Sequence, residues 1–179
     1  MNPNKEYVVL LDETGTQIGV EEKMAAHEKG LLHKAFSVVL FNHLGEMLLQ
    51  QRAFTKYHTP GLWTNACCSH PRPGEKLEDA VHRRLREELG MDCSVSEIFS
   101  FTYKFQDSAT QLWEHENDSV FIGNYSGDIP FNPAEVNAIK WITFEALEAD
   151  IQAEAEKYTF WFRTFLPKLK NHLIASDVG

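Results

Sequence analysis

Apolar residues recur along the chain at two spacings, which predict a mixture of strands and helices. Short apolar runs are typical of strands, and Asn42–Gly45 between two such runs predicts a hairpin. From Glu75 to Leu89 the apolar positions follow helical spacing, and Gly90 is a suitable C-terminal stop. The expected strands cover residues 7–11, 35–41, 46–52, 94–104, 114–125 and 138–142. The expected helices cover residues 75–89, 143–151 and about 159–173.

The order of these elements indicates the fold class. Strands on both sides of a central helix, followed by helices at the C-terminal end, predict an α/β protein with α/β/α layers and a mixed sheet. The 179 residues suit one domain, 1–179, with a core of about residues 30–165. No repeat or linker-like change of composition divides the chain, and residues 174–179 are expected to form a disordered tail.

Composition and charge narrow the class of protein. A hydrophobic content of 43% with 12% aromatic residues is typical of a soluble globular protein. No apolar run is long enough to span a membrane, and the N-terminus lacks the features of a secretory signal. Three cysteines, two of them adjacent, form no disulfide framework, so we expect a reduced, cytoplasmic protein. The net charge of −9 argues against nucleic-acid binding, although a local basic cluster could still bind a small phosphorylated ligand.

The segment Trp63–Pro71 carries the first group of reactive side chains. It places Cys68 two residues before His70 in a short extended run. Successive side chains alternate in such a run, so Cys68 shares a face with His70, whereas Cys67 points to the other side with Ser69. Cys68 is therefore the candidate acid or base, and Cys67 is interpreted as a small buried apolar residue.

A second group is formed by Glu114, His115 and Glu116. If this segment is a strand, both carboxylates lie on one face and His115 lies on the other. Two carboxylates on one face repel each other unless a cation or a shared proton compensates. The alternative interpretation is a solvated strand edge. Candidate partners for a metal site are His27, His33 and His70.

Three imidazoles and two carboxylates would complete a six-coordinate metal site. Imidazole favours Zn²⁺, Mn²⁺ or Fe²⁺, while oxygen-rich octahedral geometry favours Mg²⁺ or Mn²⁺, so the residue types leave the metal open. The remaining histidines are interpreted as ordinary surface or core residues: His43, His58, His82, His115 and His172.

Four basic residues are candidates for holding phosphate: Lys23, Arg52, Lys56 and Arg84. Arg52 and Lys56 flank the end of an expected strand, and arginine offers bidentate geometry to phosphate oxygens. The alternative for each is an ordinary surface charge. Glu88 lies one helical turn after Arg84, so the two could form a salt bridge, or Glu88 could hold Mg²⁺ against a diphosphate.

The helix expected at 75–89 resembles a Nudix box, which runs Gly, five residues, Glu, seven residues, then Arg-Glu-apolar-any-Glu-Glu-any-Gly. The corresponding positions hold Ser69, Glu75, Arg83, Arg84, Leu85, Arg86, Glu87, Glu88, Leu89 and Gly90. Ser69 thus replaces the first glycine, and Arg84 replaces the first acid of the helix. The resemblance implies a Nudix-like fold in which a cation stands where the hydrolases carry a metal-binding carboxylate.

Together, the motifs closely resemble the type 1 isopentenyl-diphosphate delta-isomerase family over most of the chain, from Glu22 through Trp161. The specific segments are Trp63–Pro71 and Trp113–Glu116. The resemblance implies an isomerase of isoprenoid biosynthesis that interconverts isopentenyl and dimethylallyl diphosphate. One proton is added and another is removed from the neighbouring carbon, through a tertiary carbocation.

The resemblance also implies roles for the matching residues. Cys68 and Glu116 would be the acid/base pair on opposite faces of the substrate, with Tyr103 hydrogen-bonded to the catalytic carboxylate. Trp161 would present its aromatic face to the carbocation, and a core tryptophan is the alternative. The first metal, Mn²⁺, Mg²⁺ or Zn²⁺, would be bound by His27, His33, His70, Glu114 and Glu116, and a Mg²⁺ on the diphosphate by Glu88. The substrate-binding residues would be Lys23, Arg52, Lys56, Ser69 and Arg84.

Two other functions stay open on the sequence. One is a Nudix hydrolase of a nucleoside diphosphate derivative, against which Arg84 and the Cys-x-His-Pro run both count. The other is a noncatalytic, metal-binding Nudix-like protein, against which the intact Cys68 and Glu116 count. The expected partner is a small-molecule diphosphate, with no nucleic acid and no membrane, and the chain is expected to be a monomer or a homodimer.

Overall fold

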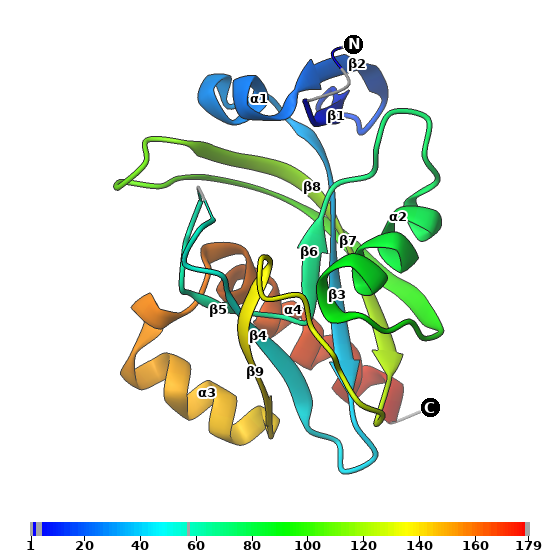
Figure 1. The fold of residues 1–179 in the computed structure, drawn as a ribbon, viewed down its shortest axis with the longest axis vertical. Helices are drawn as coiled ribbons and strands as arrows, with labels where there is room; N and C mark the ends of the chain where they lie inside the picture. Colours follow the sequence, from blue (N-terminus) through cyan, green and yellow to red (C-terminus); the bar gives the residue numbers. More distant parts are fainter. Residues whose placement is uncertain (1, 3–4, 57, 178–179) are drawn as a thin grey trace.

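The computed structural model describes residues 2, 5–56 and 58–177, and its strands form one nine-stranded sheet (Figure 1). The strands are β1 (Tyr7–Leu11), β2 (Gln17–Glu22), β3 (His33–Phe41), β4 (Met47–Arg52), β5 (Trp63–Thr64), β6 (Cys67–Ser69), β7 (Val95–Gln106), β8 (Trp113–Asn124) and β9 (Val136–Ile142). The helices are α1 (Lys23–Lys29), α2 (Leu77–Arg84), the π-helical turn η1 (Leu85–Leu89), α3 (Phe144–Ala153), the 3₁₀ turn η2 (Ala155–Lys157) and α4 (Phe160–Asp177).

Strand β3 is the centre of the sheet. It pairs in parallel with β8 along its whole length and antiparallel with β1, β4 and β6. β7 continues the sheet beyond β8, and β9 continues it beyond β4, both through antiparallel pairing. The sheet is therefore mixed, as the order of the elements predicts.

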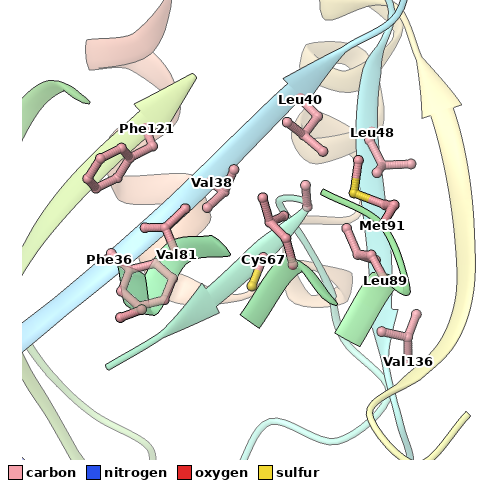
Figure 2. Close-up of a cluster of buried hydrophobic side chains, with 13 residues drawn as sticks. Phe36, Val38, Leu40, Leu48, Cys67, Val81, Leu89, Met91, Phe121 and Val136 are labelled. Atoms are coloured by element: carbon pink, nitrogen blue, oxygen red, sulfur yellow. The ribbon is translucent and has the colours of Figure 1, made fainter. Parts of the chain in front are cut away.

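Two apolar clusters pack on opposite faces of this sheet, because neighbouring strand residues point in opposite directions. Val38 and Leu40 of β3 pack with Leu89 of η1 in the first cluster, which Figure 2 shows. Val39 points the other way and packs with Phe162 of α4 in the second cluster. Full burial of such side chains stabilises a fold by roughly 1.5–3 kcal/mol each. The helices α2 and α4 thus cover the two faces, and the predicted α/β/α layering is confirmed.

Two elements near the N-terminus were not expected from the sequence. β2 is an edge strand paired only with β1, and its residues stay exposed or half-buried. α1 follows directly, and the Glu22 side chain caps it by accepting hydrogen bonds from the backbone amides of Met24 and Ala25. Gly30 ends the helix with a φ of 63°, a left-handed conformation that glycine adopts without strain. This short helix presents His27 to the sheet.

The helices at 77–89 and after Phe160 differ in detail from the expected ones. The first begins at Leu77, and its last five residues form the π-helical turn that carries Glu87 and Glu88. The second, α4, continues to Asp177 and contains Pro167. Residues 174–177 of the expected tail are therefore helical, and residues 178–179 lie outside the described part of the chain. None of the helices in the described residues is both long and apolar enough to cross a membrane.

Candidate active site

Four side chains from distant parts of the chain converge into a group suited to a metal ion. Their possible ligand atoms lie within 4.8 Å of one another, and the residues are His27, His33, His70 and Glu116. Sheet register explains part of this convergence, because His33 of β3 is the partner of Glu116 in β8. His70 follows β6, which pairs with β3, and His27 comes from α1. The structure therefore brings together the three histidines that the sequence proposes.

The imidazoles of His27 and His33 are held in the orientation that a metal ligand needs. Each Nδ1 lies 2.8 Å from a backbone carbonyl, of Trp113 and Leu31 respectively, and must donate to it because a carbonyl only accepts. The Nε2 atoms then present lone pairs, and both are buried without a hydrogen-bond partner. Burial lowers the pKa of the His27 imidazole to about 4, so that ring is neutral. Buried, unpartnered nitrogen lone pairs beside a carboxylate fit a divalent metal.

Glu116 lies at the centre of the group. Its Oε1 is 2.8 Å from His70 Nε2 and 3.4 Å from His33 Nε2, while its Oε2 accepts a 2.7 Å hydrogen bond from the Tyr103 hydroxyl. Tyr103 and Glu116 are register partners in β7 and β8, which brings the hydroxyl beside the carboxylate. Burial alone would raise the pKa of Glu116, but the neighbouring imidazoles of His33 and His70 hold that pKa well below its usual range. Glu116 is therefore a carboxylate.

Glu114 shares the buried face with Glu116, while His115 points away and contacts the Gly30 carbonyl. The strand alternation predicted for this segment is confirmed. Glu114 does not belong to the group of four, and its Oε1 lies 2.5 Å from Nε2 of His58 and 3.8 Å from Nδ1 of His27. Burial and the nearby charge of Glu116 raise the pKa of Glu114 well above its usual value.

Cys68 is surrounded by polar atoms on the α4 side of the sheet. Its thiol donates to Oδ1 of Asn65 at 2.9 Å, and its sulfur accepts from the Trp161 indole Nε1 at 3.1 Å. Burial raises the pKa of this thiol to about 12, so the sulfur carries its proton. Cys67 lies in the first apolar cluster on the opposite face (Figure 2). The predicted alternation of the two thiols is confirmed.

The candidate acid, base and aromatic wall line one narrow cavity of about 60 Å³, in which Cys68, Glu116 and Trp161 meet. The Trp161 side chain is 5% exposed and packs in the second cluster, so it is a core residue, and its role towards a carbocation stays a prediction. The Arg52 guanidinium carbon lies 5.4 Å from the centre of the indole ring. Ser69 and His70 line this cavity as well.

A larger pocket of about 420 Å³ shares Ser69 and His70 with the narrow cavity, and Lys23 and Arg84 are on its walls. Lys23 Nζ lies 2.9 Å from a carboxylate oxygen of Glu6, so these two side chains form an ion pair. The larger pocket, lined by Lys23, Arg83 and Arg84, thus adjoins the narrow cavity.

Two of the expected phosphate ligands lie elsewhere. Arg52 lines the narrow cavity and donates to the His58 backbone carbonyl, at 2.9 Å from Nη2. Lys56 forms an ion pair with Glu135, which also accepts from Arg84 at 3.3 Å. The structure therefore gathers Lys23, Ser69 and Arg84 into one pocket, whereas Arg52 lines the narrow cavity and Lys56 pairs with Glu135.

Glu88 is buried in the π-helical turn. Its Oε1 accepts from Arg84 Nη2 at 2.5 Å, and its Oε2 accepts from Gln50 Nε2 at 3.0 Å. The salt bridge that the sequence offers as one alternative is thus present. Binding of Mg²⁺ by Glu88 stays a prediction, and it would require the cation to compete with Arg84 for the carboxylate.

His58 is the residue of the site that the sequence analysis did not find. It lies in the loop between β4 and β5, is 4% exposed, and lines the narrow cavity beside Glu114. A single histidine in a loop without periodicity carries no signal for the direction of its side chain. Only its proximity in sequence to Arg52 and Lys56 could have drawn attention to it.

Comparison with known proteins defines first the class and then the family. A NUDIX domain model matches residues 31–162. A crystal structure from Deinococcus radiodurans superposes with a TM-score of 0.68 at 23% identity, covering 83% of this chain and 90% of that one. A MutT protein from Methanosarcina mazei superposes with a TM-score of 0.65 at 20% identity, covering 78% of this chain and 94% of that one. The fold is therefore that of a Nudix protein.

More similar relatives identify the family. Isopentenyl-diphosphate Delta-isomerase 2 of Aromatoleum aromaticum is 44% identical over 92% of this chain and 87% of its own length. The second such enzyme of Photorhabdus laumondii is 44% identical over 97% of this chain and 95% of its own. The isomerase of Halorhodospira halophila is 45% identical over 90% and 93%. The chain belongs to the isopentenyl-diphosphate Delta-isomerase family, as the motifs of the sequence predict.

Proposed function

We propose that this protein is an enzyme that interconverts isopentenyl diphosphate and dimethylallyl diphosphate. The observation that carries the proposal is the meeting of a thiol, a carboxylate and an indole in one narrow cavity, at Cys68, Glu116 and Trp161. An allylic isomerisation needs a proton donor at one of the two carbons that flank the cationic carbon and a proton acceptor at the other. A hydrolase would need neither the thiol nor the indole.

The two groups stand in complementary protonation states. Cys68 is a neutral thiol and Glu116 is a carboxylate. The thiol can therefore give a proton to the terminal alkene carbon, while the carboxylate takes one from C2, the carbon between the cationic carbon and the carbon that carries the diphosphate. The substrate gains one proton and loses one, so its composition is unchanged. The hydrogen bond from Tyr103 to Glu116 fixes the direction of that carboxylate. In the reverse reaction the two roles exchange.

The cavity also protects a cationic intermediate. Water would trap a tertiary carbocation as an alcohol, and the buried positions of Glu116 and Trp161 beside the partly buried Cys68 restrict its access. The indole ring offers a π face that stabilises positive charge without reacting as a nucleophile. The bond from the indole Nε1 to the Cys68 sulfur holds that ring beside the proton donor.

Trp161→Phe is expected to retain much more activity than Trp161→Ala or Trp161→Leu, because phenylalanine keeps a π face for the cation. The comparison requires kcat for each variant together with its midpoint of thermal unfolding. Equal activity and equal stability in all three variants would contradict the role in cation stabilisation. Loss of folding in all three would show that the residue serves the core alone.

We infer that a divalent metal, Mn²⁺, Mg²⁺ or Zn²⁺, is held by His27, His33, His70 and Glu116, with Glu114 as a further ligand. When bound, the ion supplies positive charge that keeps Glu116 ionised. A Mg²⁺ bound with the diphosphate at Glu88 would neutralise the phosphate oxygens. Lys23, Ser69 and Arg84, which line the larger pocket, would hold the diphosphate, with Arg52 and Lys56 as further candidates.

Exhaustive chelation is expected to abolish the isomerase activity, because the reaction depends on both ligand sets. Refilling the histidine site with Mn²⁺ or Zn²⁺ alone should leave the enzyme inactive until Mg²⁺ is added for the diphosphate. Activity and metal content are measured on the same samples. Full activity in metal-free protein would contradict the requirement for two metals.

The proposed function is tested by incubating the protein with isopentenyl diphosphate and Mg²⁺. Dimethylallyl diphosphate should appear, and no phosphate should be released. Release of phosphate without the isomer would instead support the Nudix hydrolase, and absence of both products the noncatalytic protein. We place the enzyme in the cytoplasm as part of isoprenoid biosynthesis, where its three free cysteines remain reduced. A monomer or homodimer stays our prediction.

A further inference from the structure

His58 contacts three residues that have candidate roles in the site: Glu114, Trp161 and Arg52. Its side chain reaches Glu114, its ring lies beside the Trp161 indole with centroids 6.2 Å apart and planes 20° apart, and its backbone carbonyl accepts from Arg52. No role for this residue follows from the family motifs in the sequence. Its contacts nevertheless place it between the metal group and the reaction cavity.

The contact with Glu114 is the closest of these. His58 Nε2 lies 2.5 Å from Glu114 Oε1, so the ring nitrogen directly contacts the carboxyl group. On the other side of the ring, His58 Nδ1 faces Asp107 Oδ2 at 3.8 Å. Asp107 is itself held in the turn between β7 and β8, where it accepts from the Thr110 hydroxyl and the Ala109 amide.

The orientation of Glu114 decides whether a fifth ligand reaches the metal. The group of four already has its ligand atoms within 4.8 Å of one another, and Glu114 lies just outside it, 3.8 Å from the His27 ring. A carboxylate that ligates a metal is usually fixed by a further hydrogen-bonding partner, whose loss weakens metal binding about 10- to 100-fold. His58 occupies that place for Glu114.

We propose that His58 is a positioning residue of the metal centre, which directs the Glu114 carboxylate toward the ion held by His27, His33, His70 and Glu116. This inference rests on the metal site of the proposed function. It assigns to the loop between β4 and β5 a part in metal binding. The ring acts through its hydrogen-bonding nitrogen, and the contact with Trp161 is a consequence of its position.

The test is the dissociation constant of Mn²⁺ for the purified protein, measured by titration calorimetry and by the electron paramagnetic resonance of free Mn²⁺. His58→Phe keeps a ring but has no hydrogen-bonding nitrogen, whereas His58→Gln keeps a donor without a ring. Both keep the backbone carbonyl that Arg52 contacts. We expect about 10- to 100-fold weaker Mn²⁺ binding in His58→Phe and a change within a few-fold in His58→Gln.

Three controls make the result decisive. His33→Ala should abolish the same Mn²⁺ binding, which identifies the site being measured. His82→Gln changes a half-exposed histidine that pairs with Asp92 and should leave the constant unchanged. Thermal midpoints of the metal-free variants show whether each is folded. Turnover of isopentenyl diphosphate by the wild-type protein is measured separately and tests the proposed function whatever the Mn²⁺ constants are.

The outcomes separate the proposal from a packing role. If His58→Phe binds Mn²⁺ like the wild type, or if His58→Phe and His58→Gln are weakened equally, the positioning of Glu114 by a donor nitrogen is refuted. Wild-type protein without a saturable Mn²⁺ site that depends on His33 would refute it as well. A selective loss in His58→Phe, with its thermal midpoint preserved, would support it.

Discussion

Glu116→Gln is expected to reduce the isomerase activity by more than about 10⁴-fold. A single general acid or base typically contributes ~10²–10⁴-fold. Here the same carboxylate is the proposed base, a metal ligand candidate and the acceptor of the Tyr103 hydroxyl. The neutral amide cannot take the substrate's proton and donates toward the imidazoles instead of accepting from them. Initial rates of dimethylallyl diphosphate formation measure the loss.

A matched control separates chemistry from stability. Glu97→Gln makes the same chemical change at an exposed position of β7 and should leave turnover unchanged. The Glu116 variant should remain folded, because an amide of the same shape still fits between Tyr103 and the imidazoles. Near-normal turnover by folded Glu116→Gln would show that the acid/base assignment in the segment Glu114–Glu116 is wrong.

The fold could be predicted from the sequence where apolar periodicity extends over several residues. The buried runs of β3 and β4 and the helical spacing after Leu77 are signals of this kind. β2 and α1 carry no comparable signal: the strand is half-solvated at an edge of the sheet, and the helix has only seven residues. Their structure depends on pairing with β1 and on the Glu22 cap. Such tertiary and local polar contacts override weak propensities.

The site could be predicted from the sequence where the alternation of side chains along a strand decides the direction in which each residue points. The directions of Cys67, Cys68, Glu114 and Glu116 follow from a period of two residues. Partners from distant segments do not follow from any local pattern. The ion pair of Lys56 with Glu135 joins residues far apart in sequence. His58 reaches Glu114 only because the loop between β4 and β5 meets the start of β8. The residue types alone indicated a metal site and a phosphate site. Which charged side chains pair with one another could be known only from the fold.

Cys68→Ala is expected to lose about 10²–10⁴-fold of the isomerase activity, the usual contribution of a general acid or base. Its sulfur is held between the Asn65 amide oxygen and the Trp161 indole, at the wall of the reaction cavity. Alanine removes the thiol and with it the proton that Cys68 is proposed to donate. The backbone of β6 is unaffected, because its pairing with β3 uses main-chain groups.

The adjacent Cys67 provides the control within the same strand. Its side chain is fully buried among apolar residues on the other face, so Cys67→Ala should lower the free energy of unfolding by about 1 kcal/mol and retain most of the activity. An electrophilic epoxide analogue of the substrate should label Cys68, as found by peptide mass spectrometry. Labelling of Cys67, together with an active Cys68→Ala variant, would contradict the assignment. Neighbouring residues of one strand face opposite layers of the protein. The two substitutions therefore test on which face of the sheet the reaction takes place, as well as the role of the thiol.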